Sequence, residues 1–355
     1  MHPRSRALAG ALLVATGLAA PGLTATALAS PGSAATHTAR AGAGEKIMPG
    51  PRDTYGVGGR VLELIDTRRA TPADPEAQRG PIPESDTRAI STTVFYPTDE
   101  RALPDANGLV EPIDDAPPAD GRFPVILFSH GAPGTPHDYR RMLQRWASEG
   151  FIVVAPQYPI SSTAGPTDVA WGDARNQIRD ASFVLTQVLQ RNRDAWTDGG
   201  FGGHLDPSRI GAAGHSMGGF TTLGLVSECC RDKRVDGALV LAGVSDGERG
   251  PRITNPSGPV LFAHATLDFA VPLQQATRAY RAASTPKYLV EIDLPIAGVA
   301  AHILPFTEGF GRISDQVTEV LDSFLAAYVG GDPDAAERLA PTAEDAADLK
   351  VRYRT

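Results

Sequence analysis

From Phe123 onward, short apolar runs alternate with segments of helical periodicity, and this alternation constrains the fold more than any other feature of the chain. The runs are apolar throughout, as strands buried on both faces are: FPVILFSH, FIVVAPQY, RIGAAGH, GALVLAG, PVLFAHA and KYLVEIDL. Between them, helices are predicted at 137–150, 173–190, 217–228, 272–283 and near 313–329. The alternation predicts an α/β fold, a doubly wound and mostly parallel sheet covered by helices on both faces.

Two β-rich segments come before this alternation. GRVLELID at 59–66 and RAISTTVFY at 88–96 are typical of strands, so an antiparallel hairpin is predicted to lead the sheet. The chain between GALVLAG and PVLFAHA is short, which predicts that no large cap domain covers the sheet. After Gly331 the chain is rich in Ala, Asp and Glu and is expected to pack or fray at the surface.

The amino-terminal region has the pattern of an export signal. MHPRSR is basic, the next stretch is apolar, and Ala27-Leu28-Ala29 matches an A-x-A cleavage site. We therefore predict a signal peptide at 1–29, a flexible leader at 30–52 and a single domain at 53–355. This predicts a secreted protein without a stable membrane anchor, and an uncleaved anchor is the alternative, weakened by the Gly, Pro and Thr that interrupt the apolar stretch.

Charge and cysteine content exclude several classes of partner and site. The formal net charge of −8 at pH 7 argues against nucleic acid and anionic membrane surfaces, because both require a basic patch. The cysteines are the neighbours Cys229 and Cys230, which are expected to be two buried thiols, since a disulfide between neighbours is strained. Neither state makes a metal site, and no cofactor is implied.

The stretch RIGAAGHSMGGF places a serine where a strand should turn into a helix. In a nucleophile elbow, the serine adopts a strained backbone so that its Oγ stands clear of the turn. Small residues two positions before and after it keep the strand and the helix from clashing, and Gly214 and Gly218 meet that requirement. The motif predicts Ser216 as a nucleophile, and a glycine-rich turn with an incidental serine is the alternative.

A serine nucleophile of this type needs a base and an acid that follow it in the order Ser, acid, His. Of the eight histidines, only His264 and His302 come after Ser216. His264 lies within an apolar strand and is expected to be a satisfied core imidazole, whereas His302 lies in a small-residue loop and is predicted to be the base. Asp268 follows the strand PVLFAHA and is the predicted acid, with Asp246 as its rival.

The oxyanion of the tetrahedral intermediate requires two N–H donors that are already in place. The backbone N–H of Met217 supplies one, at the start of the helix after the serine. The loop after FPVILFSH should supply the other, and Pro133 in that loop has no N–H. Ala132 is therefore the predicted second donor, with Gly131 as the alternative.

Taken together, GHSMGG, FSHG, HATLDFAVP and the loop histidine resemble the α/β-hydrolase superfamily over about 88–329. The likeness is greatest to secreted bacterial esterases of the cutinase-like polyester hydrolase, chlorophyllase and platelet-activating-factor acetylhydrolase group. The resemblance implies a Ser216–His302–Asp268 triad and oxyanion donors at Ala132 and Met217. The sequence departs from the polyester hydrolases at VSDGERG, which lacks their substrate-facing tryptophan, and by lacking their carboxyl-terminal disulfide.

These features predict a secreted serine hydrolase that cleaves carboxylic esters with short to medium acyl chains through an acyl-enzyme. An open cleft lined by Phe269, Ile303, Leu304 and Phe306 would bind a small-molecule, lipid or polymer ester, although these side chains could equally be core. The alternatives are a lipase or polyester hydrolase that acts at interfaces, and a catalytically silent binding protein with the hydrolase fold.

Overall fold

The computed structural model describes residues 54–103, 110–163, 165, 168–244, 255–307, 311–344 and 348–355, with the backbone alone at 340–344. The predicted signal peptide and leader lie outside these residues. The strands are β1 (Gly56–Asp66), β2 (Arg88–Thr98), β3 (Ile113–Asp114), β4 (Phe123–Ser129), β5 (Ile152–Pro156), β6 (Leu205–His215), β7 (Gly237–Leu241), β8 (Val260–Ala265), β9 (Lys287–Ile292) and β10 (Leu349–Arg354). The α-helices are α1 (Arg140–Ser148), α2 (Asp168–Gln190), α3 (Met217–Leu225), α4 (Gln274–Ala282), α5 (Val299–Ile303), α6 (Arg312–Leu325) and α7 (Pro333–Glu344).

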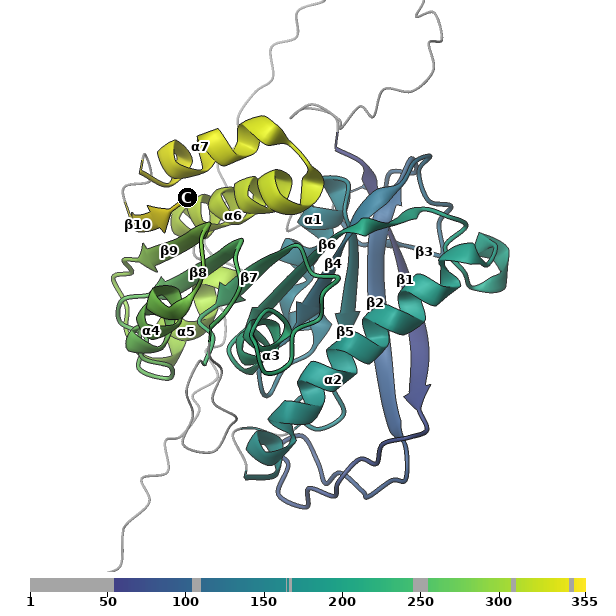
Figure 1. The fold of residues 1–355 in the computed structure, drawn as a ribbon. Helices are drawn as coiled ribbons and strands as arrows, with labels where there is room; N and C mark the ends of the chain where they lie inside the picture. The colour runs from purple at the N-terminus through teal and green to yellow at the C-terminus, as the bar shows by residue number, and fades with distance from the viewer. Residues whose placement is uncertain are drawn as a thin grey trace, which may run out of the picture. The chain divides into compact units, whose positions relative to one another are not determined.

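All ten strands belong to one sheet, in the order β10-β9-β8-β7-β6-β4-β5-β2-β1-β3 (Figure 1). The strands from β4 to β9 pair in parallel, and the antiparallel hairpin β1–β2 joins them through β5. The predicted α/β fold with a leading hairpin is therefore confirmed. β7 ends and β8 begins close together in the sequence, and among the described residues no cap domain is inserted.

The strand order reverses direction at β4, and this position determines where a site can form. From β4 the chain passes through α1 to β5 on one side, then returns through α2 to β6 on the other side. Loops at the carboxyl ends of β4 and β6 therefore diverge, and a crevice at such a reversal is where open α/β sheets bind ligands. Ser216 and the loop that begins at His130 lie at this point.

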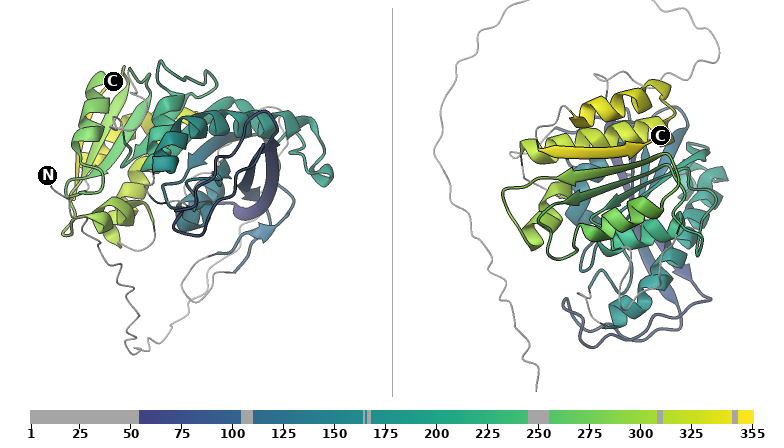
Figure 2. Two further views of the ribbon diagram at one scale, coloured as in Figure 1. Left: turned by 90° about the horizontal axis from the view of Figure 1, so that it is seen from below. Right: turned by 60° about the vertical axis from the view of Figure 1, so that its left-hand side comes forward.

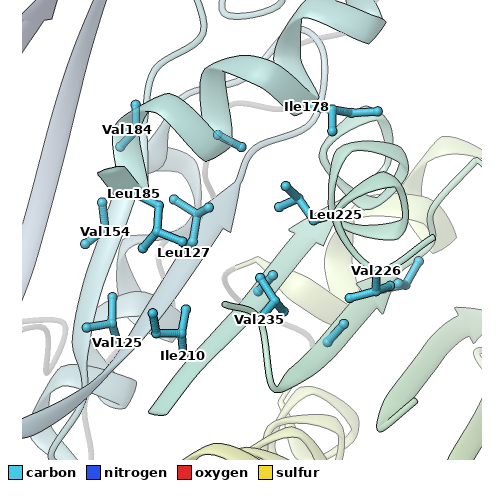
Figure 3. Close-up of a cluster of buried hydrophobic side chains, with 14 of the residues drawn as sticks. Val125, Leu127, Val154, Ile178, Val184, Leu185, Ile210, Leu225, Val226 and Val235 are labelled. Carbon is cyan, nitrogen blue, oxygen red and sulfur yellow. The ribbon is translucent and has the colours of Figure 1, made fainter. Parts of the chain in front are cut away.

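Helices bury both faces of the sheet, as the uniformly apolar strands predicted. On one face, α2 and α3 pack on side chains from β4, β5 and β6, including Leu127, Val154 and Ile210 (Figure 3). On the other face, α1 and α6 pack on the alternate side chains, including Ile126 and Val153. The right-hand view of Figure 2 shows the yellow helices α6 and α7 on one side of the sheet and the helices α3 and α4 on the other.

The carboxyl-terminal segment packs on the domain, which is one of the two predicted outcomes, but its strand was not predicted. Residues after Gly331 form α7 and β10, and β10 adds an antiparallel edge strand to β9. Its exposed side chains are largely charged, and Arg352 forms an ion pair of 2.8 Å with Glu291 on β9. Charged residues of this kind are typical of edge strands, since they oppose pairing with another chain.

The prediction of two buried thiols is wrong. Cys229 and Cys230 are exposed, in the turn after α3, and are joined by a disulfide. Neither cysteine is therefore available as a free thiol in this state. In the described part of the chain, no helix is long and apolar enough to cross a membrane.

Candidate active site

Ser216 stands on a sharp turn between β6 and α3, where its backbone has φ 55° and ψ −117°. A positive φ is strained for a residue with a side chain, and the Ser216 N–H donates to the carbonyl of Leu241 at 2.9 Å. A Cβ on Gly214 would overlap the carbonyl of Gly218, and a Cβ on Gly218 would overlap that of Ser129. The two glycines therefore allow strand, turn and helix to close around the serine.

Asp268 lies in the loop after β8 and is only 2% exposed. Its Oδ1 accepts hydrogen bonds from the backbone N–H groups of Ala270 and Val271 at 2.9 and 2.8 Å. Its Oδ2 lies 2.6 Å from Nδ1 of His302 and 3.2 Å from Nε2 of His264. Burial raises the pKa of Asp268, but hydrogen bonds from the two imidazoles outweigh burial and hold the pKa well below its usual range.

His302 lies on the short helix α5 and not in an irregular loop as predicted, because Gly298 at φ 79° allows a turn into the helix. The His302 N–H donates to the Gly298 carbonyl at 3.2 Å, which completes the turn. The His302 Nδ1 faces the carboxylate of Asp268, so Nδ1 carries the proton and Nε2 is left as the basic atom. The ring of His302 lies 4.6 Å from that of His215, the residue before Ser216.

His264 differs from the satisfied core imidazole that was expected. It is fully buried, and its Nε2 donates to the carbonyl of Val271 at 2.7 Å while lying 3.2 Å from Asp268. Its Nδ1 has no hydrogen-bond partner among the described residues. The ring therefore lies against the same carboxylate oxygen as His302, a contact that its place within a strand did not reveal.

A chain of hydrogen bonds joins the backbone of α5 to the loop after β4 through the side chains of His215 and Tyr139. The His215 Nε2 lies 2.9 Å from the backbone carbonyl of His302, which can only accept, so Nε2 carries the proton. The His215 Nδ1 therefore accepts from the Tyr139 hydroxyl at 2.8 Å, and that hydroxyl accepts from the Gly131 N–H at 3.2 Å. Burial and then the neighbouring His302 lower the pKa of His215 to about 3, so this ring stays neutral.

The loop after β4 lies directly against the elbow, since a Cβ on Gly131 would come within 3.2 Å of the Ser216 Cβ. His130 fixes this loop from within the core. Its Nε2 accepts from the N–H of Tyr158 at 3.0 Å, so its Nδ1 carries the proton and donates to the Gly131 carbonyl at 2.8 Å. Burial lowers the pKa of His130 to about 4, which keeps this arrangement neutral.

The two predicted loop donors differ in their hydrogen bonding. The Gly131 N–H already donates to Tyr139, whereas the N–H groups of Ala132 and Met217 meet no protein acceptor within the described residues. Ala132, in the loop after β4, and Met217, the first residue of α3 after β6, follow the carboxyl ends of two adjacent strands. They are therefore the better placed pair for a substrate oxyanion.

The structure does not bring together the apolar residues that were expected to line the cleft. Phe269 and Ile303 are 71% and 38% exposed and flank Asp268 and His302. Phe306 is 2% exposed, and its ring lies 5.4 Å from that of His215. Phe306 instead lines a cavity of about 650 Å³ between α1, α6 and the start of β1, and Ser216 does not line this cavity.

The rival acid Asp246 lies outside the described residues. Two other aspartates that follow Ser216 already have structural partners: Asp232 forms an ion pair with Arg234, and Asp236 accepts from the backbone N–H of Ile210. In the parts of the chain that are described, no group of three or more His, Cys, Asp or Glu side chains is arranged to hold a metal ion.

Comparison with known proteins finds a family model that matches part of this chain. The chlorophyllase family model matches residues 108–273, a range that contains Ser216 and Asp268 and ends before His302. The parallel sheet and the serine on its strand-to-helix turn are consistent with this match. The chain has the α/β-hydrolase fold.

This α/β-hydrolase is similar to chlorophyllase-1, chloroplastic, from Citrus unshiu and from Citrus sinensis, with 28% and 29% identity over 221 residues. Each alignment covers 60% of this chain and 60% of the chlorophyllase, so the chain spans less than two thirds of these relatives. It is also 25% identical over 204 residues to dipeptidyl-peptidase 5 from Porphyromonas gingivalis, covering 46% of this chain and 28% of the peptidase. These similarities indicate a serine hydrolase of the α/β-hydrolase type.

Proposed function

We propose that this α/β-hydrolase is a secreted serine carboxylesterase that works through an acyl-enzyme. The observation that carries the proposal is the strained Ser216 turn beside a His302–Asp268 hydrogen bond of 2.6 Å. In this proposal, Ser216 is the nucleophile, His302 the base and Asp268 the acid that orients it.

In the acylation half, Nε2 of His302 takes the proton of the Ser216 hydroxyl as Oγ attacks the ester carbonyl carbon. The carbonyl oxygen becomes an oxyanion and accepts from the N–H groups of Ala132 and Met217. Losing one such donor typically costs about 3–4 kcal/mol of transition-state stabilisation. When the bond to the alcohol oxygen breaks, His302 donates its proton to that oxygen, and the acyl group remains on Ser216.

In the deacylation half, His302 takes a proton from water as the water attacks the acyl-enzyme. The tetrahedral intermediate then releases the carboxylic acid, and the proton returns to the Oγ of Ser216. Asp268 supports both halves, because its ionised carboxylate stabilises the imidazolium and keeps the Nδ1 proton of His302 directed toward itself.

The substrate class proposed is a carboxylic ester of short to medium acyl chain. Phe269 and Ile303 beside the dyad are exposed and apolar, which suits an ester more than a charged substrate. The same exposed side chains keep a lipase or polyester hydrolase as the alternative within this class. Export, with cleavage after Ala29, is part of the proposal and predicts that the secreted protein begins at Ser30.

The test is labelling of the purified mature protein with a fluorophosphonate, followed by a substrate panel. Wild type is expected to label, and Ser216→Ala and His302→Ala are expected not to. Ser323→Ala is the matched control, because Ser323 is a partly exposed serine on α6 that donates to the Glu319 carbonyl. Absence of labelling in wild type would refute the proposal.

The panel then separates the alternatives within the class. Hydrolysis of soluble short esters supports the carboxylesterase. Activity on tributyrin emulsion without activity on soluble esters would move the assignment to a lipase. Cleavage of a dipeptide anilide without ester cleavage would move it toward the peptidase relative.

A further inference from the structure

An apolar cluster, separate from the two core clusters of the sheet, surrounds the residues proposed to bind the oxyanion. Its buried members are Ala77, Ile160, Ala170 and Met217, and Ile82, Ala132, Val169 and Trp171 pack against them while remaining partly exposed. We refer to these eight residues as the apolar wall. Met217 and Ala132 are the proposed oxyanion donors, so a carbonyl held by their N–H groups has its substituents beside this wall.

We infer that the apolar wall is the subsite for the acyl chain of the substrate, an inference that rests on the proposed function. The direction of each substituent follows from the roles of the residues. The leaving oxygen must lie near His302, which protonates it, and the carbonyl oxygen must point to Ala132 and Met217. The acyl chain takes the remaining direction, away from His302 and along the wall.

Besides Ala132 and Met217, the wall combines residues of the β1–β2 connection with residues between the end of β5 and the first turn of α2. Ala77 and Ile82 come from the β1–β2 connection, Ile160 follows β5, and Val169 to Trp171 form the first turn of α2. In Figures 1 and 2, the connection between β1 and β2 runs beside the amino end of α2. Within this connection, Thr71 pairs with Ser85 and Asp74 with Ile82 in antiparallel bridges, so residues 71–85 form a finger and not a loose loop.

The finger is fixed at its tip and at its base. At the tip, the Arg79 N–H donates to the Thr163 carbonyl at 2.9 Å. At the base, the fully buried Arg88 bonds to Asp173 and Asp180 of α2 and donates to the Ala70 carbonyl at 3.3 Å. These contacts tie the finger to α2, so the wall is in place before substrate binds.

The floor of the wall is also held in one position. The Gln177 side chain on α2 donates to the Met217 Sδ at 3.5 Å and accepts from the Thr221 hydroxyl at 2.8 Å. Its amide group also donates to the Ser161 hydroxyl. The thioether therefore presents a fixed apolar surface, and none of the eight wall residues carries a charge. Such a surface selects an uncharged aliphatic or aromatic acyl chain and disfavours a charged one.

The experiment measures kcat/KM for p-nitrophenyl acetate, butyrate and hexanoate with the mature protein and its variants. Each methylene that the wall buries should raise kcat/KM by about fourfold, so wild type is expected to prefer the longer chains. Trp171→Ala removes the largest side chain of the wall and should lower the hexanoate-to-acetate ratio by roughly tenfold or more. Val61→Ala, an exposed apolar residue on β1, is the control and should leave the ratio unchanged.

A second variant keeps the test independent of folding. Ile82→Ala truncates a partly exposed wall residue on the finger and should lower the same ratio in the same direction. An unchanged hexanoate-to-acetate ratio in both variants, whether or not kcat/KM falls equally on the two esters, would overturn the inference. It would leave the proposed esterase activity intact. Failure of wild type to label with fluorophosphonate or to cleave acetate would instead refute the proposed function itself.

Discussion

Replacing Asp268 with asparagine tests the acid of the proposed triad, and the structure specifies how the new side chain must sit. The Oδ1 of Asp268 accepts from two backbone N–H groups, which cannot change their role. The asparagine oxygen must therefore occupy that position, and its NH₂ group then faces the Nδ1 of His302. Two donors cannot bond, so His302 is driven to the tautomer that carries its proton on Nε2, where it cannot accept the proton of Ser216.

The magnitude follows from the contacts that the active tautomer would lose. In the variant, the tautomer of His302 with its proton on Nδ1 loses its charge-assisted hydrogen bond to the carboxylate, which is worth about 1.5–3 kcal/mol. Its buried Nδ1–H group is also left unpaired, which costs about 1–3 kcal/mol more. A total of about 3–6 kcal/mol corresponds to a loss of roughly 10²–10⁴ in kcat. The assay is kcat for p-nitrophenyl acetate at pH 8, with the rate of fluorophosphonate labelling as a second readout.

Asp246→Asn is the matched control, because Asp246 is the rival acid that the sequence offers. This variant is expected to stay within about twofold of wild type, because the proposal assigns the acid role to Asp268. A loss of less than tenfold in Asp268→Asn would refute the reasoning. If the large loss occurred in Asp246→Asn instead, the acid role would pass to that residue.

Three further predictions concern stability and the supporting hydrogen bonds. Gly218→Ala should lower the free energy of unfolding, measured in urea, by at least about 2 kcal/mol, because the new Cβ overlaps the backbone of β4. Gly172→Ala, on α2 with open space around it, should raise the free energy of unfolding by about 0.5–1 kcal/mol. Similar values for both variants would contradict the packing argument. Tyr139→Phe leaves the Nδ1 of His215 without a hydrogen-bond donor and should lower the free energy of unfolding by about 1–3 kcal/mol. The same variant should also lower kcat. An unaltered kcat would show that the hydrogen-bond chain does not position the site. Burial and a neighbouring carboxylate raise the pKa of Glu149, so its contribution to stability is present below about pH 4.5 and is lost as pH rises. Glu149→Gln should therefore have a higher Tm than wild type at pH 8 and an equal Tm at pH 4; equal values at both pH would contradict the raised pKa.

Local sequence patterns determined most of the architecture. Strands buried on both faces must be apolar throughout, and helices that cover them must repeat apolar residues every three to four positions, so both were readable one segment at a time. The edge strand β10 was missed because its exposed side chains are charged and only its pairing with β9 defines it. The disulfide between Cys229 and Cys230 was missed for a related reason, since exposure is a property of the folded chain.

The sequence alone pointed to Ser216, because the glycine spacing of an elbow is a local steric requirement. The order of residues along the chain pointed to His302 and Asp268, and the folded chain places these two side chains in contact. Only the tertiary structure decided what surrounds them: the second imidazole on Asp268, the Tyr139–His215 hydrogen bond and the apolar wall. The Tyr139–His215 bond and the apolar wall join segments that are separated in sequence, and such contacts leave no periodicity or spacing in any one segment. The contact between His264 and Asp268 joins residues only four apart, but it depends on the conformation of the chain after β8.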